Sequence, residues 1–509
     1  NMYVTTAARE SQGDTTAMHE RGKSDRSVVP MKPANEGRAA AHPEEQVEGR
    51  GLAKGNSSHG HRHRTQSRTE LGQALERVRQ AASKDKGLQL TTLWHHVYDV
   101  NRLRAAYHAL KRNAAAGVDG VTWQAYGERL DINLEQLAQR LQRRAYRPKP
   151  VRRVFIPKAD GRQRPIGVPT LEDKLVQRAT AEVMGAVFEA DFKGFSYGFR
   201  PGRSQHNALD ALVVGIKRKK IGWILDADIR GFFDTLDHGC LLGFVARRIT
   251  DARLLEAIAR WLRAGVLEDG TWREVEEGTP QGGSISPLLA NIYLHFVLDE
   301  WIDERRRMRA GGDVIVVRYA DDFIVGFQHR AEAEQFRTEL EERLRQFHLE
   351  LHPDKTRLIE FGRFAAENRQ RRGEGKPETF DFLGFTHSCA KTRSGAYQVL
   401  RQTMKKRLRA KLRAVKDELT HRMHHSIPEV GSWLGRVVEG HANYYAVPNN
   451  GRAIRSFRNQ ILVLWHRALT RRSQHGDPGW KRMYRWAAHW LPTPRIRHPW
   501  PEQRLCVIT

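Results

Sequence analysis

The sequence has 509 residues, a formal net charge of +27 at pH 7 and a pI near 10.3, which allows two or three domains and indicates a polyanionic partner. Nucleic acid is the first candidate and an anionic membrane surface the second. Its three cysteines, Cys240, Cys389 and Cys506, are far apart, which excludes a disulfide framework or a cysteine-rich zinc module and favours a reducing, cytoplasmic compartment. Neither a run of about 18 apolar residues nor an apolar signal core occurs, so we expect no membrane span and no secretion.

The N-terminal 70 residues are rich in Gly, Ser, Glu, Arg and His and poor in large apolar residues, so we expect a disordered basic and polar tail. Its "HGHRHR" (59–64) is more typical of a solvated tail than of a metal site, because no carboxylate or cysteine stands nearby. Helical periodicity then runs from about residue 69 to residue 113, where the glycines of 114–120 end it, and a second helix is predicted over 133–145.

A β-hairpin is predicted next, from short apolar runs around the Gly/Asp turn of "IPKADGRQRPIG" (156–167). Lys158 and Arg164 flank this turn, where two cations could grip a triphosphate or simply face solvent. A helix over 171–192 follows.

Strands and helices alternate between residues 220 and 330. We expect a strand at "WILDADI" (223–229), helices over 238–266, a polar loop to 283, a helix over 286–307 and a β-hairpin over 313–327. Mixed strands and helices around a hairpin predict an α+β fold.

The rest of the chain changes from mixed to helical. A helix to about residue 348, the segment "LHPDKTRLIEF", a Gly/Lys/Arg linker at 362–377 and a short strand at 379–385 precede three amphipathic basic helices and an extended Pro-rich segment at 490–504. Residues 401–509 carry 22 Lys/Arg against 6 Asp/Glu, or +16 of the net charge, which indicates a dedicated binding region. The Arg and Trp residues between 465 and 490 could bind nucleic acid or pack a small helical core.

The hexapeptide "RYADDF" places Asp321 and Asp322 at the tip of an otherwise apolar hairpin. In "WILDADI", Asp226 and Asp228 share one face, because strand side chains alternate. If this strand pairs beside the hairpin, Asp228, Asp321 and Asp322 converge, and three such carboxylates repel one another. A divalent cation removes the conflict, since Mg²⁺ binds carboxylate and phosphate oxygens and two ions can clamp an in-line phosphoryl transfer. Taken alone, the two adjacent aspartates could also be ordinary turn residues.

Two further features lie in the sequence between Asp228 and Asp321. The Gly-rich "GTPQGG" (278–283) precedes a helix begun by Ser286 and Pro287; glycines permit close backbone approach and a helix N-terminus favours anions. Asp237 stands before another helical stretch and is interpreted as its N-cap.

In order along the chain, eight segments resemble motifs of the group II intron reverse transcriptases, over about residues 90–390. They are "RNAAAGVDGVTW", "IPKADGRQRPIGVPTLEDKLVQ", "FSYGFRPGRSQHNAL", "DADIRGFFDTLDH", "GTPQGGSISPLLANIYL", "RYADDF", "HPDKTRLIEF" and "FDFLGF". The stretch "GHANYYAV" is similar to the family's thumb, or maturase, region and extends the resemblance to about residue 450. The resemblance implies a right-hand polymerase with fingers, palm and thumb, two Mg²⁺ ions, dNTP substrates, an RNA template (the group II intron RNA) and a DNA primer or target.

The same resemblance implies roles for single residues. Asp228 and Asp321 would hold the metal ions, with Asp322 beside them and the Ile229 carbonyl as a further ligand. Phe233 would lie under the sugar and reject a ribose 2′-OH, although an aromatic residue at a strand end is usually part of a core. Three more side chains would contact the incoming nucleotide: Lys158 and Arg164 at the triphosphate, and Gln281.

Lys355 of "HPDKT" would protonate the departing pyrophosphate, with a plain salt bridge as the alternative. Arg200 and Arg203 of "FRPGRS" would touch template or nucleotide, or lie on the surface.

These motifs predict a tail at 1–70, fingers and palm at 71–390, a thumb/maturase (X) domain at 391–455 and a basic nucleic-acid-binding region at 456–509. Many relatives end in an H-N-H endonuclease with paired cysteines; because Cys506 stands alone, we expect none. The predicted function is an RNA-dependent DNA polymerase of a mobile intron that also assists splicing and retrohoming. A splicing maturase without polymerase activity, or a domesticated or CRISPR-associated reverse transcriptase, are the alternatives. Intact Asp228 and Asp321 favour the polymerase, and the oligomeric state stays open.

Overall fold

The computed structural model of the chain describes residues 72–157, 163–268, 271–273, 278, 282–472 and 477–505. The N-terminal tail with its "HGHRHR", together with Lys158, Gln281 and Cys506, lies outside these residues. Within them, helices and sheets are mixed, as the α+β prediction requires. None of the helices in the described ranges is both long and apolar enough to cross a membrane.

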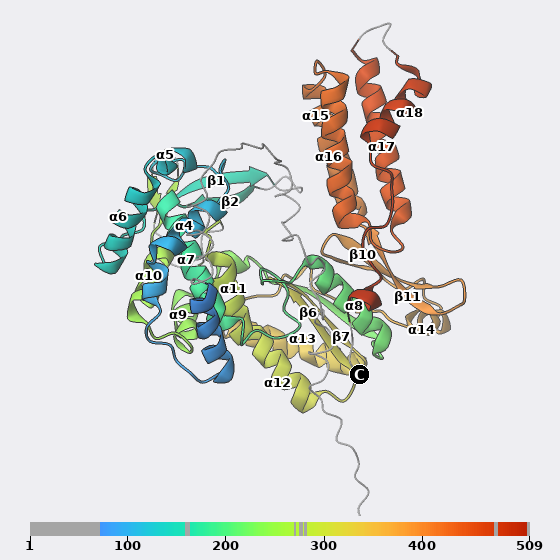
Figure 1. Cartoon of the computed structure of the whole chain (residues 1–509). Coiled ribbons are helices and arrows are strands. Elements are labelled where there is room, and N and C mark those ends of the chain that lie inside the picture. Colours follow the sequence, from blue (N-terminus) through green and yellow to red (C-terminus); the bar gives the residue numbers. More distant parts are fainter. Residues whose placement is uncertain are drawn as a thin grey trace, which may run out of the picture.

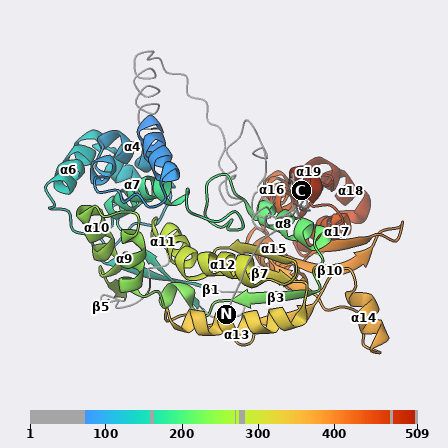
Figure 2. The same cartoon turned by 90° about the horizontal axis from the view of Figure 1, so that it is seen from below.

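A four-stranded sheet has the spatial order β6-β7-β3-β8, and its strands β3 and β7 lie near the centre of the view in Figure 2. All its strand pairs are antiparallel, so "WILDADI" does pair beside the predicted hairpin. Because strand side chains alternate, Leu225 and Val325 enter one hydrophobic core, whereas Ile224 and Ile324 enter a second core on the other face. The strands are β3 (Trp223–Asp228), β6 (Val314–Tyr319), β7 (Asp322–Phe327) and β8 (Arg357–Glu360).

Helices cover both faces of this sheet. Helix α13 (Arg330–Arg345) packs against β3 and β7, and α8 (Gln205–Arg218) packs against β6 (Figures 1 and 2). A continuous helical segment supports the turn between β6 and β7; it consists of α11 (Ser286–Leu294), the π turn η2 (His295–Asp299) and α12 (Glu300–Arg309). The predicted helix over 286–307 is therefore confirmed, with a wider turn inside it.

The N-terminal part of the described chain is a helical layer with a small sheet. The hairpin of β1 (Val151–Pro157) and β2 (Gln163–Val168) is confirmed, and β1 also pairs in parallel with β4 of a short second hairpin that the sequence analysis assigned to a polar loop. That hairpin was missed because its strands have three residues each. The remaining elements are a helix at 72–84, α3 (Trp94–Val97), α4 (Val100–Ala109), α5 (Trp123–Gly127), α6 (Leu130–Gln142), α7 (Leu171–Phe188), the 3-10 turn η1 (Phe232–Asp234), α9 (His238–Ala246), α10 (Ala252–Leu262), β4 (Val266–Glu268) and β5 (Thr271–Arg273).

The helix expected to run continuously from about residue 69 to 113 is broken in the structure. Asp99 starts a new helix, because its side chain accepts a hydrogen bond from the Arg102 amide. Asp251 accepts the Leu93 and Trp94 amides at 2.7 and 2.8 Å, which fixes the start of α3 from 157 residues away in the sequence. Periodicity alone does not reveal such caps.

A three-stranded sheet and a helical bundle follow the central sheet. The bundle stands on the β10–β11 hairpin (Figure 1). The sequence analysis expected only the first of these strands, and it placed α14 in a linker. The elements are α14 (Ala365–Arg371), β9 (Phe380–Phe382), β10 (Phe385–Lys391), β11 (Tyr397–Thr403), α15 (Lys405–His421), α16 (Ile427–Tyr445), α17 (Gly451–Thr470), α18 (Gly479–Trp490) and α19 (Pro501–Arg504).

Residues 491–505, called the C-terminal strap below, leave α18 and return to the central part of the molecule. The strap binds α16 through an ion pair of Arg497 with Glu439, and α8 through a ring stack of His498 on His206 with centroids 3.9 Å apart. At its end, Arg504 reaches Asp210 of α8 at 3.0 Å. The predicted extended segment is confirmed for residues 491–500, but Pro501–Arg504 form the short helix α19 instead. Several basic side chains of the strap are already paired within the protein.

Candidate functional site

The end of β3 and the turn between β6 and β7 bring the predicted aspartates together. Asp228, the last residue of β3, is the register partner of Asp322, the first residue of β7, so both side chains lie on the same face of the sheet. Asp321 lies in the two-residue turn beside them, after Ala320, whose φ of +58° is unusual for a residue with a side chain. Alternation also places Asp226 on this face, two residues before Asp228.

The carboxyl groups interact strongly with one another. Burial is the largest cause that holds the pKa of Asp322 well above its ordinary value, and the charges of Asp226, Asp321 and Asp228 add to it. Burial likewise raises the pKa of Asp226 to about 7. It also raises the pKa of Asp321, to which the charge of Asp228 contributes. These shifts show that the half-buried carboxyl groups repel one another, although Arg357 lies 3.8 Å from Asp226 and the charge of Arg407 lowers the pKa of Asp322.

Two predicted cations lie close enough to offset part of this charge. Arg164 of β2 and Lys355 both lower the pKa of Asp321, although burial outweighs them. The Lys355 ammonium lies 2.5 Å from a carboxylate oxygen of Asp228, so the salt bridge considered as the alternative role of Lys355 is present. The backbone explains this contact, because the His352 amide donates to the Asp228 carbonyl at 2.7 Å and closes the turn that carries Lys355.

The backbone after β3 also orients the Ile229 carbonyl. Ile229 bridges to Leu351, and the two bonds of this bridge use the carbonyl of Asp228 and the amide of Arg230. Successive carbonyls of an extended strand point to opposite sides. The Ile229 carbonyl therefore points away from Leu351, toward the side on which the β6–β7 turn lies.

Phe233 lies in η1, directly after the aspartate strand. Its ring is half-buried and packs on the buried Phe232, with centroids 5.3 Å apart. Gly278, at the start of the Gly-rich loop, has a φ of +83° and fits so closely that an added Cβ would lie 2.7 Å from the Phe233 carbonyl. At the other end of this loop, a Cβ on Gly282 would lie 2.5 Å from the carbonyl of Gly167 in β2. Glycine at these two positions thus lets one end of the loop lie against the Phe233 turn and the other end against the β1–β2 hairpin.

The side chains of Arg200 and Arg203 are held within the protein. Arg200 is buried, pairs with Glu189 and donates to the carbonyl of Ser196, and Arg203 donates to the carbonyls of Gly194 and Ser196. Both arginines hold the loop that runs beside β6.

Sequence reasoning did not assign a role to Arg318, which is fully buried beside the turn. Its guanidinium binds both carboxylate oxygens of Asp299 at 2.7 and 2.5 Å and donates to the Ala320 carbonyl at 3.0 Å. Charged side chains are rarely fully buried unless paired. The signal that the sequence did offer is an arginine that directly follows the apolar run of a predicted strand.

The donor set fits a divalent cation that is bound together with a phosphate substrate. Among the residues that the structure describes, no three His, Cys, Asp or Glu side chains form a ready-made metal site. Mg²⁺ commonly uses one or two carboxylates plus substrate phosphates. Asp228 and Asp321 with the Ile229 carbonyl could provide such a partial set, and the raised pKa values of Asp321 and Asp322 are consistent with a site that favours added positive charge.

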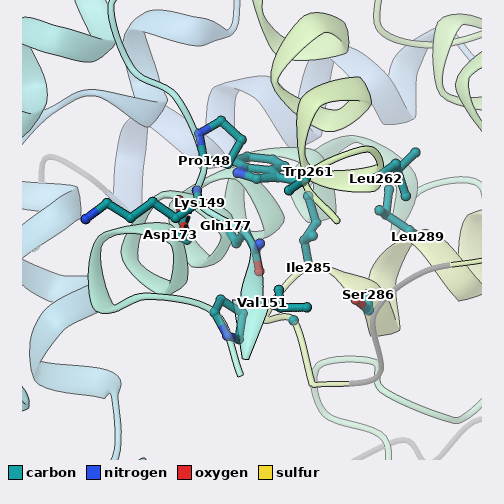
Figure 3. Close-up of a pocket in the computed structure, with 13 residues that line it drawn as sticks. Pro148, Lys149, Val151, Asp173, Gln177, Trp261, Leu262, Ile285, Ser286 and Leu289 are labelled. Carbon is teal, nitrogen blue, oxygen red and sulfur yellow. Dashed lines mark hydrogen bonds between the residues drawn. The ribbon is translucent and has the colours of Figure 1, made fainter. Parts of the chain in front are cut away.

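A cavity lies between the basic hairpin, α7, α10 and the start of α11 (Figure 3). Its walls are mostly apolar, and the buried side chains of Asp173 and Gln177 in these walls already have partners. Asp173 accepts from the Thr170 hydroxyl at 2.7 Å, and Gln177 accepts from the Ser284 amide at 2.9 Å. The cavity does not include the aspartates; Gln177 instead anchors the segment that follows the Gly-rich loop.

Known proteins resemble this chain over the same region. The family described as reverse transcriptase (RNA-dependent DNA polymerase) matches residues 156–387, which include β3, the β6–β7 turn and Lys355. Protein YkfC of Escherichia coli (strain K12) is 36% identical over 299 residues, which cover 51% of this chain and 77% of that protein.

Proteins named for introns are also similar. The group II intron-encoded protein LtrA of Lactococcus lactis subsp. cremoris is 36% identical over 231 residues, 45% of this chain but only 38% of LtrA. The nuclear intron maturase 3 of Arabidopsis thaliana is 29% identical over 144 residues, 28% of this chain and 20% of that protein. Together with the acidic site, these matches confirm the resemblance seen in the sequence, and the chain belongs to the reverse transcriptase (RNA-dependent DNA polymerase) family, in its group II intron-encoded reverse transcriptase/maturase branch.

Proposed function

We propose that the chain copies an RNA template into DNA at the β6–β7 turn, using two Mg²⁺ ions and dNTPs. One observation carries this proposal: Asp228 and Asp322 are register partners, with Asp321 beside them and Arg164 and Lys355 near Asp321. When bound, the two metal ions would stabilise the attacking 3′-oxygen and the leaving phosphate oxygen of an in-line displacement. Asp228, Asp321 and the Ile229 carbonyl are their proposed ligands.

Asp322 has a different proposed part from Asp321. Its pKa is held well above the ordinary value, first by burial and then by the charge of Asp226, so it keeps a proton more readily than an ordinary aspartate. We assign Asp322 to the orientation of its neighbours, with direct metal ligation secondary.

The cationic residues have roles around the triphosphate. Arg164, on β2, offers a planar guanidinium that can pair with phosphate oxygens, and Lys158 and Gln281, outside the described residues, complete the set carried over from the family. Lys355, which binds Asp228, is the proposed proton donor to pyrophosphate. Phe233, on the turn directly after the aspartate strand, would exclude a ribose 2′-OH by contact.

The larger arrangement fits a right hand in this proposal. The helical layer with β1 and β2 would form the fingers, the central sheet with α8 and α11–α13 the palm, and the bundle α15–α18 the thumb (Figure 1). The bundle and the strap carry most of the charge of +16 held by residues 401–509, which suits contact with a phosphate backbone.

We also propose that the natural template is a group II intron RNA and that the chain assists its splicing. The support is the similarity to LtrA and to the Arabidopsis maturase, which covers less than half of either protein.

Primer extension on an RNA template with Mg²⁺ tests the chemistry. Asp321→Asn should reduce the extension rate by at least about 100-fold, because residues that only support a metal ligand already cost about 10 to 100-fold when removed. Asp131→Asn, an exposed carboxylate on α6, serves as the control and should extend like the wild type. Equal extension by Asp321→Asn and the wild type would refute the proposed site.

A further inference from the structure

Arg318 connects the β6–β7 turn to the helical segment beneath it. Its side chain is completely buried, and its guanidinium makes more contacts than one ion pair needs. Two of its nitrogens bind the carboxylate of Asp299. The third nitrogen donates both to the Asn291 side-chain oxygen at 3.1 Å and to the Ala320 carbonyl at 3.0 Å. The last contact is made directly to the turn that carries Asp321.

The partner Asp299 is placed by an unusual feature of its helix. It is the last residue of the π turn His295–Asp299, and it is fully buried. A π turn shifts the residues that follow it around the helix, and such turns are frequent at functional sites. Here the turn places a carboxylate under β6, where it binds the guanidinium.

The opposite side of the turn is held by Gly198. A Cβ at this position would lie 2.3 Å from the Ala320 nitrogen, so only glycine allows the two backbones to approach this closely. Asn291 donates from its side-chain nitrogen to the Gly198 carbonyl at 2.7 Å, while its oxygen accepts from Arg318. One buried asparagine therefore links both supports of the turn.

The conformation that these contacts hold is not a relaxed one. Ala320 has a φ of +58°, in a region that residues with a side chain rarely adopt, and a strained residue persists only where its surroundings fix it. The backbone of Arg318 is itself fixed, since its amide donates to the Phe195 carbonyl and its carbonyl accepts from the Tyr197 amide. The position of Asp321 relative to Asp228 is thus fixed by the Arg318 side chain, by the close approach of Gly198 and by the backbone bonds to Phe195 and Tyr197.

We propose that Arg318, together with Asn291 and Asp299, is a positioning residue that sets the affinity of the aspartate site for divalent cations. The inference rests on the proposed function. A buried ion pair that served stability alone would need Asp299 only, whereas Arg318 also binds the turn carbonyl adjacent to Asp321. Loss of this contact lets the turn relax and moves the Asp321 carboxylate away from Asp228.

The test uses a variant that removes the charges as a pair. Arg318→Met combined with Asp299→Leu leaves no unpaired buried charge, and such replacements are often neutral for stability. Mn²⁺ binding, followed by electron paramagnetic resonance of the full chain with primer–template duplex and a non-hydrolysable dNTP analogue, gives a readout other than activity. We expect the Mn²⁺ Kd to rise by about 10 to 100-fold.

Two further variants separate positioning from folding. Arg248→Met with Asp191→Leu removes another buried ion pair, which holds the segment after the first helix, and should leave the Mn²⁺ Kd unchanged. Asn291→Ala keeps the Arg318–Asp299 pair and breaks the link to Gly198, so it should raise the Kd by a smaller factor. Thermal unfolding of each variant shows whether it is folded.

The outcomes distinguish this inference from the proposed function. If Asp321→Asn weakens Mn²⁺ binding but the folded Arg318→Met/Asp299→Leu variant binds like the wild type, the positioning role is wrong and the metal site stands. If Asp321→Asn itself binds Mn²⁺ like the wild type, the metal site fails. If the double variant does not fold, Asn291→Ala decides, and an unchanged Kd there overturns the inference.

Discussion

Two charged clusters, one around the half-buried aspartates of the β6–β7 turn and one around the buried Asp210, lie on the same side of the central sheet and differ in how their charge is balanced. At the β6–β7 turn, neighbouring carboxylates contribute to the raised pKa values of Asp226, Asp321 and Asp322, and Lys355 is the direct ion-pair partner of Asp228. At the strap, by contrast, a single aspartate is matched by two arginines. Arg401 binds one oxygen of the buried Asp210 and Arg504 the other, at 2.5 and 3.0 Å.

The difference separates a binding site from a structural contact. In the strap cluster, burial raises the pKa of Asp210 and both arginines counteract it, so the protein supplies its own counter-charges. At the turn, Arg164, Lys355, Arg357 and Arg407 lie near the carboxylates, yet the carboxylates still raise the pKa values of Asp226, Asp321 and Asp322, so a bound cation would relieve a repulsion that these side chains leave. Repulsion between neighbouring carboxylates, in addition to burial, distinguishes the functional cluster.

The largest expected effect comes from breaking the balanced cluster. Asp210→Leu leaves Arg401 and Arg504 buried without their carboxylate, which should lower the free energy of unfolding by about 3–5 kcal/mol. Urea unfolding of the full chain measures this. A loss below about 1 kcal/mol would show that the strap is not held by this contact, and the Mn²⁺ affinity of the folded fraction should not change.

Lys355 tests the carboxylates of the β6–β7 turn through its ion pair with Asp228. If the lysine donates a proton to pyrophosphate, Lys355→Met should slow extension by about 100-fold or more, and Lys355→Arg should not restore it, because arginine does not release its proton. Single-turnover extension rates at saturating dNTP measure both variants. Full rescue by arginine would reduce Lys355 to the partner of Asp228.

Replacing Asp322 should raise the free energy of unfolding, whereas replacing Asp210 should lower it. Since its folded-state pKa lies well above the unfolded value, the carboxyl group destabilises the fold above its unfolded pKa, and the penalty disappears as pH falls below it. Asp322→Asn should therefore raise the unfolding free energy of the metal-free protein at pH 8 by on the order of 1 kcal/mol. The gain should vanish near pH 4; a destabilised variant at pH 8 would contradict the charge imbalance.

The smallest effect is expected at Ala320. Ala320→Gly removes the cost of a positive φ, about 1–2 kcal/mol, but adds the entropy of glycine in the unfolded chain, about 0.5–1 kcal/mol. The melting temperature should change little. Ala320→Val, which adds a β-branched side chain in the same conformation, is the comparison and should be clearly less stable.

Much of the site followed from local sequence patterns. The alternation in "WILDADI" placed Asp226 and Asp228 on one face, and the apolar runs around "RYADDF" gave the hairpin, so their pairing was the one assumption needed. Asp237 was predicted as an N-cap, and its side chain does accept from the Cys240 amide. Lys355 was identified by its motif, but only the bond from the His352 amide to β3 shows how it reaches Asp228.

Contacts between distant segments could not be read in this way. The role of Arg318 depends on Asp299, which a π turn places beneath it, and on Asn291 and Gly198 from two other segments. The β10–β11 hairpin was missed although "TRSGA" contains a turn glycine, Gly395 with a φ of +83°, because its strands mix polar and apolar residues on both faces. The strap was predicted as extended, but its partners on α8 lie nearly 300 residues earlier.

That separation has a consequence for how the protein is made. Lys217 of α8 and its partner Glu502 are 285 residues apart. The partners of Asp210, Arg401 and Arg504, are likewise synthesised long after it. At about 5–20 residues per second, a ribosome needs roughly 15–60 s to synthesise the intervening chain. During this time α8 carries Asp210 without the two arginines that pair with it in the folded protein. The central sheet therefore completes its packing only after the strap has emerged, and a stalled nascent chain should be a poorer folder than the released protein.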